Sequence, residues 1–552
     1  MTRGHRGKKE HIHREQPKAE PQKKEGDLVA SKMASKWVIP LLIAAGVVWF
    51  GFYAGHTKES PGSDDREYAS IGRNIVEGKG IVRNFIYPVE INFFDKVPVP
   101  EFVHPPGYPL ILAGFFKLFG ISDFSALLPS YLSYFVLMLL FIFFAKKYLE
   151  FKTAVVATVI LIFNKEILDL SLVALSELAY TVIFFLFFIF MFKARSLREI
   201  FISGILLGLS HSIRENIYPY LLPLFVYLYF YPDLPRWRKI LFFIIGLSIP
   251  NLFNIIRSYL ETGSPFFSYA KFALMTYTDK YPWMDIYRHV QDPSFEIGQF
   301  LRKYLRNLVS AWEGILSVSN TYLLALFFVE MFYWNTGTQW KRAKVFILLI
   351  MVSQIFFAPL ITFNSRYFIP FLPMIVLFGS QSFLRISGNI FSGVTANWKR
   401  SISLLIVLLF FIFFMMPSTS VILRRSGTPA LGSKTPQYGF LVPRGEAKKL
   451  NDFLNGELKE NQIVWTDLPE ILEWEGDRLC GWLPTRVEHL YEIHKKIPVD
   501  AILLTSVRTP TSMEQEWKYL LFTEQSLPQY RNVKLYKSGM LFAKLLIRDE
   551  RD

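Results

Sequence analysis

The 552-residue sequence contains one cysteine, Cys480, so an intramolecular disulfide is excluded. No group of cysteines and histidines has the spacing of a structural zinc site. No glycine-rich stretch has the Walker or Rossmann spacing that binds a soluble nucleotide. No internal repeat of the kind common in transporters is present. These absences disfavour a disulfide scaffold, a zinc domain and nucleotide-dependent chemistry.

Apolar residues, by contrast, are abundant. The chain is 51% hydrophobic and 17% aromatic, with 53 phenylalanines, which indicates a protein built mainly of membrane helices. The net charge of +15 does not predict a nucleic-acid partner, because much of the basic excess lies in the N-terminal tail and in short turns between apolar runs. The composition therefore predicts an integral membrane protein.

Apolar runs predict a polytopic α-helical fold with about eleven spans. The first run, 37–54, lies too far from the start for an ordinary signal peptide and predicts an uncleaved span. With the N-terminus inside and the C-terminus outside, the basic turns fall on the cytoplasmic side. The other predicted spans are 127–145, 153–170, 174–192, 200–213, 217–231, 240–257, 315–333, 343–361, 367–384 and 401–417.

The same pattern predicts the domain organisation. A disordered basic cytoplasmic tail precedes a membrane domain, and a linker rich in glycine, proline, serine and threonine leads to a small exoplasmic α/β domain with β-rich runs. Within the membrane domain we expect a first exoplasmic loop, an interfacial helix too short to span, and a second large exoplasmic loop. The predicted boundaries are 1–36, 37–420 (containing 55–106, 107–120 and 258–314), 421–445 and 446–552.

The run Asp64-Asp65-Arg66-Glu67-Tyr68 follows the first span directly. A carboxylate in this position can accept a proton from an acceptor hydroxyl, as sugar transfer requires. An Asp-Asp pair before a helix is also a common N-cap with a favourable dipole contact. The two interpretations are compatible, since one aspartate can cap while the other reacts.

A second motif, His104-Pro105-Pro106-Gly107-Tyr108, opens the predicted interfacial helix. Two prolines fix the entry angle of a helix, and on that interpretation His104 is only an interfacial polar residue. On the functional interpretation, His104 lies at headgroup depth and binds phosphate through its ring.

Together these motifs resemble the GT-C superfamily of polyprenyl-phosphate-sugar-dependent transferases, in particular the protein O-mannosyltransferase and lipid A aminoarabinose transferase branch. The family begins its first exoplasmic loop with an Asp-Glu-x-x-Tyr type motif, whose first carboxylate is taken as the base. The resemblance implies that Asp64 is the base and Asp65 its acidic partner, with Asp in place of the usual Glu. It implies that His104 lies near the donor phosphate, and that Tyr68 and Tyr108 are candidate substrate-binding residues.

Two further matches lie near the ends of later spans. Ser176-Glu177 resembles the second acidic position of the family, although a glutamate there can also simply snorkel or cap. Arg366-Tyr367 resembles the Arg-Tyr start of a late span whose arginine contacts lipid phosphate, a role that suits a permanently charged forked donor. Arg214 is a candidate substrate-binding residue or part of an ion-paired turn.

The resemblance implies an inverting glycosyltransferase that moves a sugar from a polyprenyl-phosphate donor to a hydroxyl of a lipid glycan, a protein or an envelope polymer on the exoplasmic face. It implies a bacterial inner membrane location. We expect no cofactor and no metal, although Asp64 and Asp65 could ligate a divalent cation. The alternatives are a lipid or solute transporter or flippase, and a scaffold whose acidic motif is merely structural.

Overall fold

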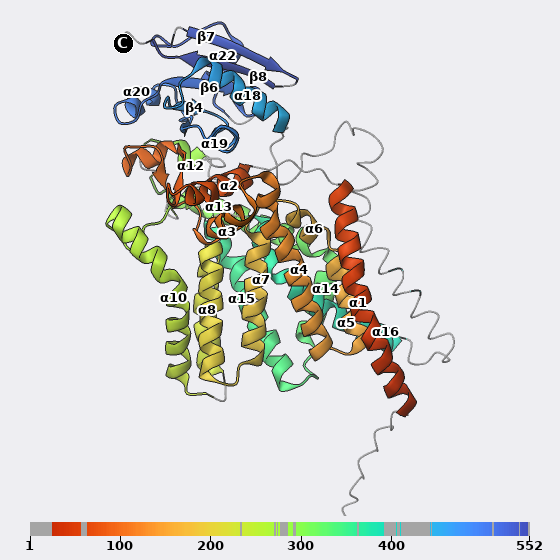
Figure 1. Cartoon of the computed structure of the whole chain (residues 1–552). Helices are drawn as coiled ribbons and strands as arrows, with labels where there is room; N and C mark the ends of the chain where they lie inside the picture. The colour runs from red at the N-terminus through yellow and green to blue at the C-terminus, as the bar shows by residue number, and fades with distance from the viewer. Residues whose placement is uncertain are drawn as a thin grey trace, which may run out of the picture.

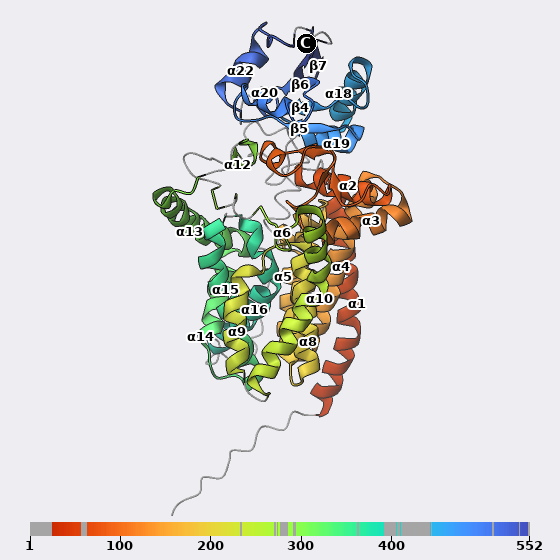
Figure 2. The same cartoon turned by 90° about the vertical axis from the view of Figure 1, so that its left-hand side faces the viewer.

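The structure is a computed structural model in which helices form an upright bundle with two further layers at one end (Figure 1). A layer containing α2 and α3 covers that end of the bundle, and a β-sheet region lies beyond it (Figures 1 and 2). The structure describes residues 25–56, 63–231, 234–269, 285–290, 294–361, 364–390, 444–509, 513–530, 532–539 and 541–549, with a few single positions between them.

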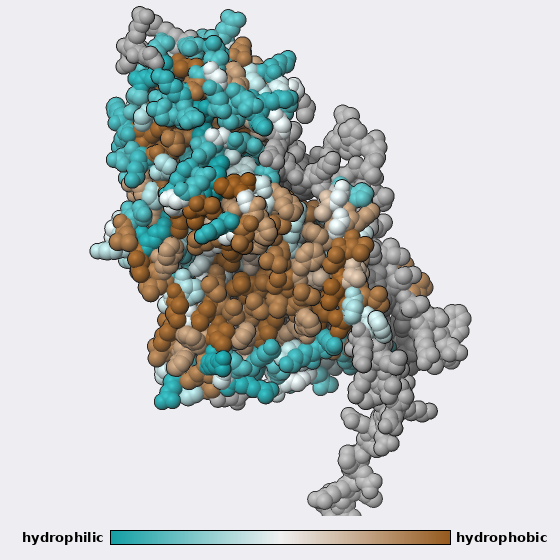
Figure 3. Space-filling view, in the orientation of Figure 1, coloured by the Kyte–Doolittle hydropathy of each residue, from teal (hydrophilic) through white to brown (hydrophobic). Residues whose placement is uncertain are grey.

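Among these residues, five helices are long and apolar enough to cross a membrane. On the face of the molecule shown in Figure 3, the helical bundle carries an apolar band with polar residues beyond it. The predicted membrane protein is therefore confirmed. These helices are α1 (Glu25–His56), α4 (Asp123–Tyr148), α10 (Arg236–Thr262), α15 (Thr338–Ile361) and the 3-10 segment η2 (Ser365–Phe371) with α16 (Leu372–Ile390).

Two predicted spans are interrupted. The run 153–170 forms two helices, because the Asn164 side chain accepts a hydrogen bond from the Ile167 amide and starts a new helix. The run 315–333 crosses a 99° bend at Asn320, a residue with positive φ. The run 401–417 falls almost wholly outside the described residues, so the count of about eleven spans stays a prediction. The helices concerned are α5 (Phe151–Ile162), α6 (Lys165–Ser171), α13 (Ile297–Ser319) and α14 (Thr321–Phe332).

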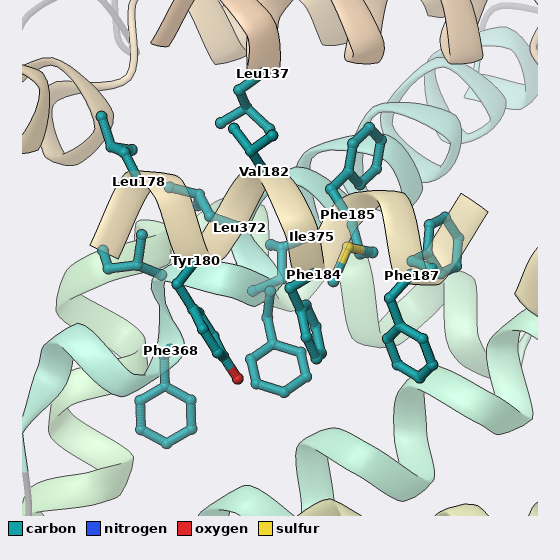
Figure 4. Packing of buried hydrophobic residues seen from close by; sticks show 14 of the residues in the cluster. Leu137, Leu178, Tyr180, Val182, Phe184, Phe185, Phe187, Phe368, Leu372 and Ile375 are labelled. Carbon is teal, nitrogen blue, oxygen red and sulfur yellow. The ribbon is translucent and has the colours of Figure 1, made fainter. Parts of the chain in front are cut away.

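The bundle core is centred on α7 (Glu177–Lys193). Figure 4 shows its side chains Tyr180, Phe184 and Phe187 beside residues of η2 and α16. Helix α7 is apolar on all sides, and most of its residues are buried against neighbouring helices. Its N-terminal residue Glu177 is thereby held at the end of the bundle nearest the sheet.

Helices α8 (Leu197–Ile213) and α10 cross very closely. A Cβ atom at Gly204 would lie 2.3 Å from the Phe243 carbonyl oxygen, and one at Gly246 would lie 2.3 Å from that of Phe201. Small residues allow such backbone approach in membrane helix pairs. Helix α9 (Tyr218–Phe230), which lies between α8 and α10 in the sequence, has only 13 residues.

The layer above the bundle contains the first predicted loop. Helix α2 (Ser63–Val76) packs against α3 (Gly107–Phe119). The chain segment that connects these two helices forms short strands and a 3-10 turn. The predicted interfacial helix thus exists as a 13-residue helix. The connecting elements are β1 (Val82–Arg83), β2 (Phe85–Ile86), η1 (Pro88–Asn92) and β3 (Val99–Pro100).

The predicted C-terminal α/β region is confirmed, and its sheet recruits one strand from the first loop. The six strands run in the order β2-β5-β4-β6-β8-β7, with β2 parallel to β5. The Cys480 amide donates to the Asn84 carbonyl oxygen at 2.9 Å. The remaining elements are α12 (Asp285–Arg288), α18 (Arg444–Glu457), β4 (Val464–Thr466), α19 (Pro469–Gly476), β5 (Cys480–Trp482), α20 (His489–His494), β6 (Ala501–Thr505), α22 (Gln515–Phe522), β7 (Asn532–Ser538) and β8 (Leu541–Ile547).

The N-terminal boundary differs from the prediction. Helix α1 begins at Glu25, so residues 25–36 are helical rather than disordered. This segment is rich in good helix formers such as alanine, leucine, methionine and lysine, and it continues directly into an apolar span. Residues 1–24 and most of the predicted linker lie outside the described part of the chain.

Candidate active site

Helix α2 presents its two aspartates to different surroundings. Consecutive residues on an α-helix point about 100° apart, since 3.6 residues complete a turn. The Asp64 carboxylate is 45% exposed, whereas Asp65 is 1% exposed and buried where its charge acts on Arg66 and Tyr108. Asp64 is therefore the accessible carboxylate of the pair.

Arg366 joins Asp64 to Glu177. Its Nη2 atom lies 3.1 Å from Asp64 Oδ2, and its Nη1 atom lies 2.9 Å from Glu177 Oε1. Arg214 Nη1 lies 2.8 Å from the same Glu177 oxygen and 3.2 Å from Ser176 Oγ. Four candidate residues that are far apart in the sequence, Asp64, Glu177, Arg214 and Arg366, thus form one ionic cluster.

The cluster favours an ionised Asp64. The surrounding protein opposes ionisation of this carboxylate, but the charges of Arg366 and His104 outweigh that effect and hold its pKa below the ordinary 3.8. A carboxylate in this state is ready to accept a proton whose donor lies beside it.

Glu177 has a different environment. Its side chain is only 1% exposed, and its Oε1 atom pairs with both Arg214 and Arg366. Glu177 is therefore enclosed by protein, whereas Asp64 is partly open to solvent. This arrangement suits a residue that orients the two guanidinium groups. Each arginine side chain is itself about 15% exposed, so both remain partly open to solvent.

His104 pairs with a carboxylate of the same acidic motif. Its Nε2 atom lies 3.3 Å from Glu67 Oε2, and its ring lies 4.6 Å from that of Tyr68. Burial alone would lower the pKa of His104, but Glu67, together with Glu101 and Asp64, raises it to about 9. His104 is therefore an imidazolium at neutral pH, a form that suits the phosphate-binding interpretation.

The three predicted tyrosines surround the cluster in different ways. Tyr68 OH lies 3.3 Å from Ser176 Oγ, and Arg214 lies over the ring of Tyr367 at 5.4 Å. Tyr108 is fully buried, its ring edge against Tyr68 and its hydroxyl 3.3 Å from Ser130 Oγ. Tyr68 and Tyr367 thus line the cluster, while Tyr108 supports Tyr68 from behind.

The sequence interpretation missed the group that supports His104. Arg83 is fully buried and contacts Glu67 at 3.1 Å, Glu90 at 2.5 Å and Glu101 at 3.2 Å. Glu101 Oε1 in turn accepts hydrogen bonds from the backbone amides of Val103 and His104, at 2.5 and 2.6 Å. Glu67 and Glu101 stand in or beside the two motifs, but no sequence signal links them to Arg83.

Glu215 is a second acidic group that the sequence interpretation did not select. It follows Arg214, and the surrounding protein raises its pKa to about 7, although the His104 charge opposes that rise. Its side chain nevertheless touches solvent.

The described residues contain no group of three histidine, cysteine, aspartate or glutamate side chains that could hold a metal ion. The charges that act most strongly on Asp64 are those of Arg366, His104 and Arg214, and these three cations disfavour binding of a metal cation beside it. Independence of a metal stays a prediction.

Comparisons with known proteins show which proteins this chain is similar to. The model of the dolichyl-phosphate-mannose-protein mannosyltransferase family matches residues 103–253, which include His104, Glu177 and Arg214. No curated protein matches the chain. The resemblance to the GT-C superfamily of polyprenyl-phosphate-sugar-dependent glycosyltransferases is confirmed.

Two solved structures share the fold over almost the whole chain. ArnT from Cupriavidus metallidurans bound to undecaprenyl phosphate has a TM-score of 0.56 at 12% identity, with 94% of this chain and 99% of that chain covered. The apo state of the same protein has a TM-score of 0.53 at 13% identity, with coverage of 93% and 98%. The α/β region is therefore part of the shared fold.

Proposed function

From its likeness to the GT-C superfamily, we propose that this chain is a membrane glycosyltransferase that takes a hexose or pentose from a polyprenyl-phosphate donor. The acceptor is a hydroxyl group on the exoplasmic face, carried by a lipid glycan, a protein or an envelope polymer. The membrane is a bacterial inner membrane, and the reaction inverts the configuration of the anomeric carbon.

The proposed reaction is a single displacement. The acceptor oxygen forms a bond to the anomeric carbon while the bond from that carbon to the phosphate oxygen breaks. Asp64 accepts the hydroxyl proton, and the electron pair of the broken bond stays on the departing lipid phosphate. A single displacement places the acceptor opposite the leaving group, which is why the product is inverted.

Two cations offset the charge of the leaving phosphate. Arg366 offers a forked donor set that matches phosphate oxygens, and His104 is held as an imidazolium by Glu67. Tyr367 follows Arg366 in the sequence and contacts the donor phosphate with it, while Tyr68 and Arg214 provide aromatic and polar contacts for the sugar. Tyr108 packs against Tyr68, and Asp65 is buried beside the cluster.

The observation that carries the proposal is the 3.1 Å contact between Asp64 and Arg366. A base for the acceptor and a cation for the leaving group must both lie within reach of one anomeric carbon. This contact brings them together from residues 302 positions apart.

Transfer from radiolabelled polyprenyl-phosphate sugars in proteoliposomes tests the proposal. Asp64→Asn should lower the transfer rate about 100-fold or more, because a positioned general base contributes at least that factor. Glu77→Gln makes the same chemical change on a partly exposed residue just after α2 and should leave the rate unchanged.

Equal rates for the wild type and Asp64→Asn would contradict the role of Asp64. No transfer by the wild type from any polyprenyl-phosphate sugar would contradict the enzyme class and favour a transporter or flippase instead.

A further inference from the structure

A pocket lies at the opposite end of the bundle from Asp64. It is enclosed by the C-terminal end of α7, by α9 and by the first turns of α15, and its volume is about 360 Å³. The 17 residues of α7 separate it from Glu177 by about 25 Å. It is therefore a different site from the candidate active site.

The walls of this pocket are aromatic and its rim is basic. Phe188, Phe192 and Phe346 are buried in the walls, while Lys193, Arg195 and Arg342 contribute the cations. Among the described residues that line it, none is acidic. An anionic group would thus meet three positive charges and no lining carboxylate.

Hydrogen bonds between lining residues fix the shape of the pocket. Tyr231 OH donates to the Ala194 carbonyl oxygen at 2.6 Å, and Gln339 Nε2 donates to that of Phe192 at 2.9 Å. The Arg342 guanidinium lies over the Tyr231 ring at 5.1 Å, which directs it toward the pocket lining. A preformed site loses little conformational entropy when a ligand binds.

The position of the pocket indicates what kind of anion it takes. Its lining residues come from the C-terminal ends of α7 and α9 and from the start of α15, at the end of the bundle remote from the sheet. On the face shown in Figure 3, polar residues follow the apolar band at that end. Basic pockets between membrane helices at this depth bind lipid headgroups. Aromatic walls would contact acyl chains or the glycerol region, whereas a free anion would gain nothing from them.

We propose that this pocket binds the phosphate headgroup of an anionic membrane phospholipid, with Arg195 and Arg342 at the phosphate and the aromatic walls against its apolar part. The bound lipid fills the space between α7, α9 and α15 at the membrane surface.

The test is a titration of the purified, detergent-solubilised full chain with a fluorescent phosphatidylglycerol. Arg195→Gln combined with Arg342→Gln should raise the Kd about thirtyfold, since each basic residue near the surface contributes roughly a fivefold factor. Arg195→Lys combined with Arg342→Lys keeps both charges and should bind within a few-fold of the wild type.

Two further variants test whether a change in the Kd comes from this pocket and not from the general charge of the protein. Arg236→Gln combined with Arg238→Gln removes two exposed charges that do not line the pocket and should leave the Kd unchanged. Thr338→Trp keeps every charge but fills the pocket, and it should weaken binding even if the double glutamine variant does not fold.

Inorganic phosphate at matched ionic strength should not displace the lipid. Displacement by phosphate would overturn the lipid assignment in favour of a soluble anion. Equal weakening by both glutamine pairs, or an unchanged Kd in Thr338→Trp, would overturn the pocket as the binding site.

Discussion

Arg366 is shared by two carboxylates, with Asp64 3.1 Å from one terminal nitrogen and Glu177 2.9 Å from the other. Glu177 is buried and also held by Arg214, so the exposed contact with Asp64 is the one that a ligand can replace. On the proposed function, the donor phosphate competes with Asp64 for Arg366. Donor binding then frees the base at the moment when it is needed.

This competition predicts different pH dependences for the two kinetic parameters. Asp64 must be ionised, so activity falls as pH falls through its pKa. In the free enzyme Arg366 keeps that pKa below 3.8. In the donor complex the phosphate occupies Arg366 and adds a negative charge, which raises the pKa of Asp64. The acid limb of kcat should therefore lie at higher pH than that of kcat/KM. Coincident limbs would contradict the competition.

Glu67 should set the alkaline limb of the same profile. His104 acts as an imidazolium, so activity falls as pH rises through its pKa of about 9. Glu67→Gln removes the largest charge that stabilises this cation, and the alkaline limb should move toward pH 6.5, the ordinary value for histidine. Measurement of kcat/KM against pH checks this, with Glu77→Gln as the control. An alkaline limb that stays near pH 9 in Glu67→Gln would exclude His104 as the titrating group.

Glu177→Gln should destabilise the protein far more than Asp64→Asn. Glu177 is buried between two arginines, and its neutralisation removes the carboxylate that pairs with Arg214 and one of the two that pair with Arg366, at a cost of about 3 kcal/mol. Asp64 is 45% exposed, so loss of its pairing should cost less than about 1 kcal/mol. Denaturation of both variants in the same detergent measures the difference. Similar losses of stability would show that Glu177 is not the structural anchor of the cluster.

Arg73 should connect the α/β region to the candidate active site. It lies on α2 with Asp64, donates to the carbonyl oxygens of Trp474 at 3.0 Å and Glu473 at 2.7 Å, and pairs with Asp477 at 2.7 Å. Arg73→Gln should cost about 2 kcal/mol of stability and also lower the transfer rate, because α2 positions the base. Lys449→Gln changes an exposed cation of α18 and serves as the control. A normal transfer rate in Arg73→Gln would mean that α2 is positioned without this contact.

The sequence indicated the residues of the ionic cluster that stand in recognisable motifs, but not the buried residues that hold them in place. Asp64, His104 and Arg366 stand in short polar motifs between apolar runs, so the motifs could be recognised without the fold. Arg83 could not be, because its role depends on three carboxylates that only the folded loop brings around it.

The same reason explains the errors in the fold. Apolar runs mark membrane helices but do not show an internal cap such as Asn164 or a bend such as Asn320. The strands of the α/β region were visible from their β-rich runs. The addition of β2 from a distant loop was not, since two residues carry no strand pattern of their own.

Binding of undecaprenyl phosphate to the wild type, Asp64→Asn and Arg366→Gln, measured beside sugar transfer, tests the central claim most directly. If the donor phosphate replaces Asp64 at Arg366, Asp64→Asn should bind the lipid phosphate at least as tightly as the wild type while it fails to transfer sugar. Arg366→Gln should lose binding. Loss of lipid binding in Asp64→Asn, or unchanged binding in Arg366→Gln, would contradict the account.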